Sequence, residues 1–80
     1  MSRPLWAIAQ DIYMDWGKNV SAASRPYLEA MSELETVNDM YYADSGRSVV
    51  LYALSNLGSY RGETARKLKK ELKELLKFGS

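Results

Sequence analysis

The sequence contains no cysteine and no histidine in its 80 residues. Without cysteine the chain can form no disulfide bond and no thiolate zinc site. Without histidine it lacks the side chain that most often acts as a general base and a metal ligand. It has no apolar run of about 18 residues, the length that a transmembrane helix needs, and no secretory signal pattern. We therefore expect a cytoplasmic protein that is not an enzyme and holds no metal or cofactor.

The net charge of +1 conceals two parts of opposite sign. Residues 1–60 carry four Lys or Arg and seven Asp or Glu, a charge of −3. Residues 61–80 carry seven Lys or Arg and three Glu, a charge of +4. Such asymmetry indicates a charged partner or complementary packing between copies. Eighty residues are near the lower limit for independent folding, so we expect one domain over residues 1–80, which could gain stability by forming homo-oligomers.

Four segments have the apolar periodicity and the end signals of helices. The expected starts are at Pro4, at Ser24, at Asp44 or Ser45, and at Ser59 or Gly62. Gly17 and Gly58 are the expected stops of the first and third segments. Residues 35–43 fit either a short helical turn or a loop, and residues 78–80 are expected to form a frayed tail. The sequence predicts an all-α fold, a compact bundle of about four helices.

The third segment is apolar around most of its circumference. Its apolar residues are Val49, Val50, Leu51, Ala53, Leu54 and Leu57. Because such a helix is normally packed on nearly all sides, we expect helix three to be central, with the other helices around it. The first segment has one apolar arc instead, which includes Trp6 and Trp16, and we expect both side chains to be buried.

The last segment carries a one-sided row of cations. At about 100° per residue, one arc holds Arg66, Lys69, Lys70, Lys73 and Lys77. We call these five residues the basic ridge. The other flank neutralises itself through i,i+4 pairs such as Lys67 with Glu71. The ridge is either a solubilising face or a site for anions, meaning an acidic protein or the phosphates of nucleic acid. Base-specific reading is disfavoured, because the ridge contains no Asn or Gln.

Tyrosine is more abundant than a core of this size requires. The four that are hardest to bury together are Tyr41, Tyr42, Tyr52 and Tyr60. They either surround the core with their hydroxyls in water or form an aromatic partner surface, because Tyr covers area with little loss of entropy.

Two further features have ordinary structural explanations. The carboxylate pairs Asp11 with Asp15 and Glu29 with Glu33 lie on polar helix faces, where we expect them to be solvated. The stretch "DSGRS" could bind an anion at a helix N-terminus, but a plain helix cap is the favoured reading.

The order of "SRPLWAIAQDI", "RPYLEAM", "DSGRSVVLYALSN" and "YRGETARKLKKELK" resembles small uncharacterised helical proteins of bacteriophages and bacterial mobile elements. The resemblance implies no activity. It implies an accessory protein that binds or inhibits a host macromolecule. We expect a small protein–protein interaction module whose partner is a host protein or a second copy. The alternative is a sequence-nonspecific nucleic-acid binder that uses the basic flank of the C-terminal helix.

Overall fold

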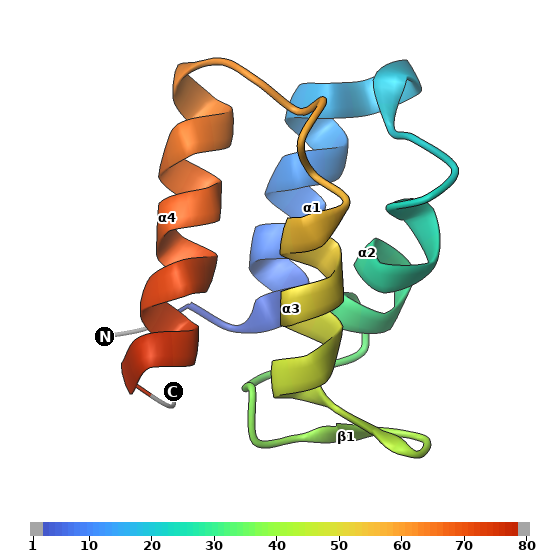
Figure 1. Ribbon diagram of the computed structural model, residues 1–80, viewed down its shortest axis with the longest axis vertical. Helices are drawn as coiled ribbons and strands as arrows, with labels where there is room; N and C mark the ends of the chain where they lie inside the picture. The colour runs from blue at the N-terminus through green and yellow to red at the C-terminus, as the bar shows by residue number, and fades with distance from the viewer. Residues whose placement is uncertain (1–2, 79–80) are drawn as a thin grey trace.

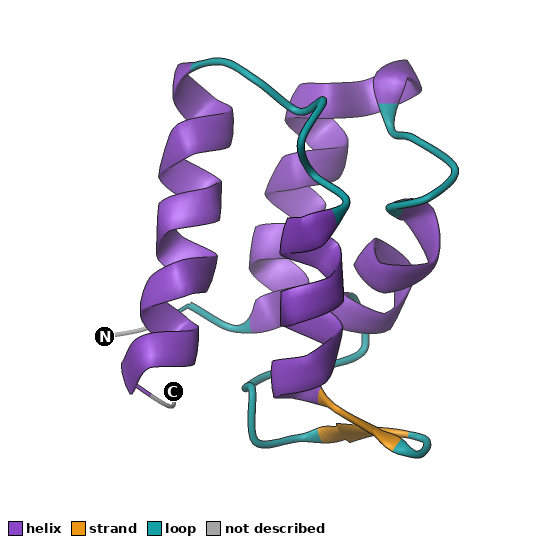
Figure 2. Ribbon diagram, in the orientation of Figure 1, coloured by secondary structure: helices purple, strands orange, loops and turns teal. Residues whose placement is uncertain are grey.

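Four α-helices and a short β-hairpin make up residues 3–78, the part of the chain that the computed structural model describes (Figures 1 and 2). The elements are α1 (Leu5–Trp16), the 3-10 turn η1 (Gly17–Asn19), α2 (Arg25–Met31), β1 (Met40–Tyr41), β2 (Asp44–Ser45), α3 (Gly46–Ser55) and α4 (Glu63–Phe78). The expectation of a mostly helical protein with four helices is confirmed. The prediction of a strictly all-α fold was wrong, because the protein also contains a β-hairpin. Within residues 3–78 no helix combines the length and apolar character that crossing a bilayer requires.

Each helix makes its main contacts with two neighbours. Both α1 and α3 pack against α2 and against α4, so the helices form a ring in the order α1, α2, α3, α4 around one core (Figure 1). The central position expected for helix three is not confirmed. On α3, Leu51 and Tyr52 are 52% and 54% exposed. Part of the apolar circumference of α3 therefore faces solvent.

The core draws apolar side chains from every helix and from the connecting loops. Its fully buried large members include Leu5, Ile8, Ile12, Leu28, Met31, Val37, Val50, Leu57 and Leu72. Trp16 is buried as expected, but Trp6 is 45% exposed. The reason is its position on α1, because at 100° per residue Trp6 lies about 100° from the middle of the buried arc.

The starts of α1 and α3 follow the expected signals in part. Pro4 is the N-cap of α1, and Gly17 ends that helix with a positive φ of 57°. Ser45 caps α3, because its Oγ accepts a hydrogen bond from the Ser48 N–H at 3.2 Å. Ser24 precedes α2, yet its buried hydroxyl bonds to Ser21 and does not cap the helix.

The ends of α3 and α4 differ from expectation. The third helix ends at Ser55, three residues before Gly58. The last helix includes Phe78, so the predicted tail does not begin there. Gly79 and Ser80 lie outside the described residues.

Of residues 35–43, which fitted a turn or a loop, residues 35–39 form a loop and residues 40–43 form the first strand and the tip of the hairpin. Met40 pairs with Ser45 and Tyr41 with Asp44 in antiparallel register, which leaves Tyr42 and Ala43 at the tip. The Asp39 carboxylate accepts hydrogen bonds from the N–H groups of Glu35 and Thr36 at 3.0 and 3.1 Å. These two bonds lower the pKa of Asp39. The Asp39 side chain thus stabilises the backbone conformation of this loop.

Candidate partner-binding surface

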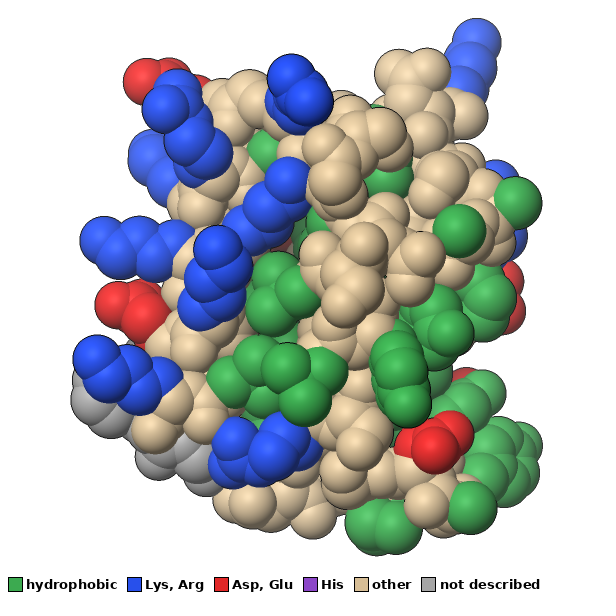
Figure 3. Space-filling view, viewed as in Figure 1, with side chains coloured by type: hydrophobic (Ala, Val, Ile, Leu, Met, Phe, Trp, Pro, Cys, Tyr) green, Lys and Arg blue, Asp and Glu red, His purple; other side chains and the backbone are tan. Residues whose placement is uncertain are grey.

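The four tyrosines expected on a partner surface do not all lie at the surface. Tyr42 and Tyr52 are 85% and 54% exposed, and Tyr41 is half-buried. Tyr60 is only 2% exposed and belongs to the core. On the face shown in Figure 3, hydrophobic side chains gather over the hairpin and beside α3. Three of the four predicted tyrosines therefore remain candidates.

The hairpin presents an aromatic tip. Tyr42 has a φ of 55°, the only positive φ of a non-glycine residue in the described chain. Its ring meets the Tyr41 ring edge to face, with centroids 4.7 Å apart and planes at 81°. Met40, which precedes them, is 61% exposed. Partial burial and the charge of Glu33 raise the pKa of Tyr41, so this ring borders an acidic environment.

The exposed side of α3 continues the apolar surface. Tyr52 stacks on Tyr27 of α2, with centroids 5.6 Å apart and planes at 26°, and Leu51 lies beside it in the sequence. We define the aromatic surface as Met40, Tyr41, Tyr42, Leu51 and Tyr52. Sequence reasoning missed Leu51. Leu51 could have been found, because it lies opposite the buried Val49, Val50 and Ala53 on a helical projection.

Tyr60 fixes the loop between α3 and α4 to the end of α1. Its ring stacks on Trp16 with centroids 4.9 Å apart, and its hydroxyl donates a hydrogen bond to Asp15 Oδ2 at 2.7 Å. Burial and the bond to Asp15 raise the pKa of Tyr60. The Lys69 ammonium donates to the Tyr60 carbonyl and lies 5.8 Å from the ring centroid. Tyr60 is thus a structural residue, and its assignment to the partner surface was wrong.

The structure divides the basic ridge by accessibility. Arg66, Lys70 and Lys73 are exposed, and none of them forms an ion pair with another residue between 3 and 78. Lys77 is also exposed, in the last turn of α4. Lys69 is half-buried and bonded to Tyr60. Burial and the charges of Arg61 and Lys73 lower the pKa of Lys69. Lys69 is therefore the ridge cation least suited to an external anion.

Two arginines from other segments extend the positive charge of α4. Arg47 of α3 donates from Nη1 to the Leu76 carbonyl at 2.6 Å, where a cation complements the C-terminal end of the helix. Arg61 lies close enough to Lys69 to affect its pKa. Lys and Arg side chains accordingly cluster over the α4 side of the molecule (Figure 3). Both arginines lie outside the helical arc from which the ridge was deduced.

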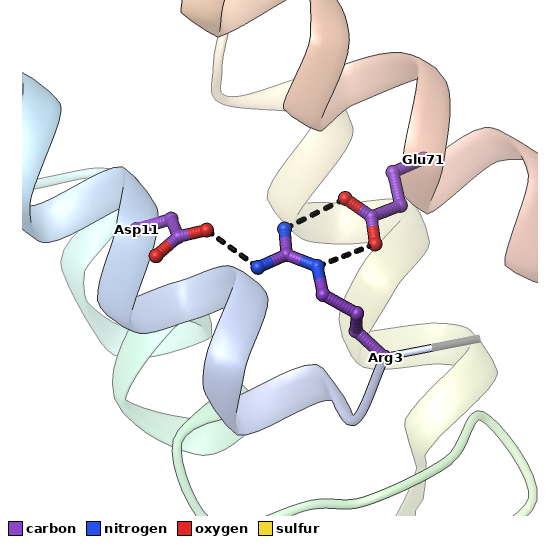
Figure 4. A network of polar contacts seen from close by, with 3 residues as sticks. All are labelled: Arg3, Asp11 and Glu71. Carbon is purple, nitrogen blue, oxygen red and sulfur yellow. Dashed lines mark hydrogen bonds and ion pairs between the residues drawn. The ribbon is translucent and has the colours of Figure 1, made fainter. Parts of the chain in front are cut away.

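The opposite flank of α4 is tied to the N-terminal segment. The Arg3 guanidinium donates to both carboxylate oxygens of Glu71, at 2.7 and 2.8 Å, and to Asp11 Oδ2 at 2.6 Å (Figure 4). These bonds, first to Glu71 and then to Asp11, raise the pKa of Arg3. Glu71 therefore pairs with Arg3 and not, as predicted, with Lys67.

Within residues 3–78 the acidic side chains do not gather into a cation site. Asp11 and Asp15, a candidate pair in the sequence, have separate partners, Arg3 and Tyr60. Glu29 and Glu33 are exposed, as expected for solvated side chains. Within the described part of the chain no three acidic, His or Cys residues come together in a group that could hold a metal.

The N-terminus of α3 is occupied by the protein itself. The N–H groups of Gly46 and Arg47 donate to the carbonyls of Asp39 and Val37, at 2.7 and 2.9 Å. A Cβ on Gly46 would lie 2.6 Å from the Thr36 carbonyl oxygen, so only glycine lets the loop approach this closely. These N–H groups are not available to an external anion, and "DSGRS" is a cap.

No protein-family model, curated protein or solved structure matches the chain. The function must therefore be inferred from the side chains described above.

Proposed function

We propose that this protein is a small helical protein–protein interaction module that binds its partner through the aromatic surface. The observation that carries the proposal is the conformation of Tyr42. A bulky residue at positive φ at the tip of a hairpin is unfavourable, and glycine or asparagine is the usual occupant. Tyr42 is 85% exposed, so little burial within the fold offsets that cost.

The composition of the surface supports a protein as the partner. Tyrosine, methionine and other large side chains are enriched where proteins contact one another, and charged residues are depleted at the centre of such contacts. Met40, Tyr42 and Tyr52 are each more than half exposed. The resemblance to small phage and mobile-element proteins favours a host macromolecule as the target, bound by an accessory protein without catalytic activity.

Site-specific photo-crosslinking tests this proposal. A photoreactive amino acid replaces Tyr42 in one variant and Gln10, an exposed residue of α1, in a control. Each purified protein is mixed with host lysate, with and without an excess of unlabelled wild-type protein. We expect a discrete product from position 42 that the wild-type competitor abolishes and that the Met40→Ser substitution weakens, because Met40 is 61% exposed on the same hairpin. Equal products from both positions, or products insensitive to the competitor, would contradict the proposal.

A second candidate function is sequence-nonspecific binding to nucleic acid. The observation in its favour is the exposure of Arg66, Lys70 and Lys73 without acidic partners in residues 3–78. Contacts to phosphates would make the affinity fall with salt, with a log–log slope of about −0.9 per phosphate on duplex DNA. With Lys69 bonded to Tyr60, we expect a slope of roughly −3 to −4. Absence of binding to labelled duplex and single-stranded DNA at about 50 mM salt would exclude this function.

A further inference from the structure

The two sides of α3 carry opposite charge. On one side α4 contributes six Lys or Arg and three Glu, a charge of +3. On the other side, the segment from Arg25 to Ser45 contributes one Arg and five acids, a charge of −4. Both flanks pack directly against α3. One face of the molecule thus carries a basic edge over α4 and hydrophobic side chains beside α3 and over the hairpin (Figure 3), while the segment on the other side of α3 is acidic in composition.

The outward side of α3 is suited to contact with another helix. Leu51 and Tyr52 are about half exposed, and Ser55, one helical turn beyond Leu51, is small and exposed. A small residue beside two large apolar ones allows a partner helix to approach closely. Arg47 and Tyr52 mark the two edges of this strip, since Arg47 reaches α4 and Tyr52 stacks on α2.

From this arrangement we infer that the outward side of α3 binds a second copy of the chain, in a two-fold dimer whose axis runs parallel to α3. This inference rests on the proposed function, because Leu51 and Tyr52 belong to the aromatic surface, and it assigns that part of the surface to self-association. With the axis along α3, α4 of each copy lies against the acidic flank of the other. An axis across α3 would place α4 against α4, and like charges would repel.

The contact area that such a dimer needs is a modest share of the protein's surface. A standard interface covers about 800 Å² of each partner. The protein exposes 5122 Å², so the contact would use roughly a sixth of its surface. The arrangement is closed, because each copy uses its basic and its acidic flank once, and the association therefore stops at the dimer.

Reciprocal charge reversal tests the arrangement. One variant carries Lys70→Glu and Lys73→Glu on α4, and the other carries Glu33→Lys and Asp44→Lys on the acidic flank. All four side chains are exposed, and circular dichroism verifies that each variant is folded. Sedimentation equilibrium over micromolar to millimolar protein should show a wild-type dimer, and each variant alone should dimerise at least about tenfold more weakly.

The decisive measurement is the mixture of the two variants. In the mixed dimer every reversed flank again meets a flank of opposite sign, so association should return to about the wild-type strength. A control with Lys18→Glu and Lys67→Glu lowers the net charge by the same amount as the α4 variant, at two exposed positions that do not belong to the basic ridge, and it should dimerise like the wild type. A monomeric wild type, or a mixture as weak as either variant alone, would overturn the dimer. Crosslinking from position 42 would still decide the proposed function separately.

Discussion

The contact between Tyr60 and Asp15 gives a stability prediction with a pH signature. Replacing Tyr60 by Phe keeps the ring on Trp16 but removes the hydroxyl that bonds to Asp15 at 2.7 Å. Asp15 is exposed and can be hydrated in the variant, so no buried polar group is left without a partner. We expect a loss of about 0.5–1.5 kcal/mol, which corresponds to a melting temperature lower by roughly 2–12 °C in a domain of this size.

The same contact determines how the protein responds to alkali. The folded-state pKa of Tyr60 is raised above its ordinary value of 10.0. The neutral phenol therefore stabilises the fold fully below pH 10.0, and this contribution is lost as the pH rises through the folded-state pKa. Urea unfolding measured from neutral to strongly alkaline pH should show a steeper decline for the wild type than for Tyr60→Phe.

Tyr42→Phe is the matched control, because it removes the same hydroxyl from a side chain that is 85% exposed. It should leave both the melting temperature and the alkaline profile unchanged. If Tyr60→Phe behaves like Tyr42→Phe at neutral and at alkaline pH, the bond to Asp15 contributes nothing and the role assigned to Tyr60 is wrong.

Four other substitutions test the fold. Leu72→Ala, in the core, should lower the free energy of unfolding of the monomer by about 2–5 kcal/mol. Leu51→Ala, on the outward side of α3, should change this monomer value by less than about 0.5 kcal/mol. Similar losses for the two variants in chemical denaturation of dilute protein would contradict the ring of helices. Gly46→Ala should lower the free energy of unfolding by about 1–3 kcal/mol in the same assay, because its Cβ would lie 2.6 Å from the Thr36 carbonyl oxygen. An unchanged denaturation midpoint would show that the loop moves to accommodate the methyl group. Asp39 has a pKa below its ordinary value of 3.8, so its carboxylate stabilises the fold above that pH and this effect disappears as the pH falls through the folded-state pKa. Asp39→Asn should therefore flatten the acid side of the stability profile, and an identical acid profile would contradict the anchoring bonds.

The helices could be predicted because their signals are local. Gly17 and Ser45 act at the ends of helices through their own backbone or side chain, and the apolar stripe of α4 repeats over several turns. The hairpin could not be predicted in the same way, since strands of two residues show no alternation. The tip residue Tyr42 also lacks the asparagine or glycine that normally identifies such a turn.

The candidate site was predicted only where exposure follows from position on a single element. Tyr42 lies at a loop tip and is exposed. Tyr60 is buried because it contacts Trp16 and Asp15, both more than 40 residues away in the sequence. Lys69 is half-buried because it bonds to the Tyr60 carbonyl, nine residues earlier in the loop before α4, and a helical projection of α4 alone does not include that loop. The central placement of helix three was inferred from apolar composition, which cannot distinguish a buried face from one that binds another molecule.

Under the proposed function, the left-handed conformation of Tyr42 places opposite demands of binding and folding on one residue. Asparagine or glycine at position 42 should leave the protein as stable as before, or more stable by up to about 1 kcal/mol, because either residue tolerates positive φ better than tyrosine. A screen that selects only for thermal stability should therefore replace this tyrosine early. A screen that selects for partner binding should retain it.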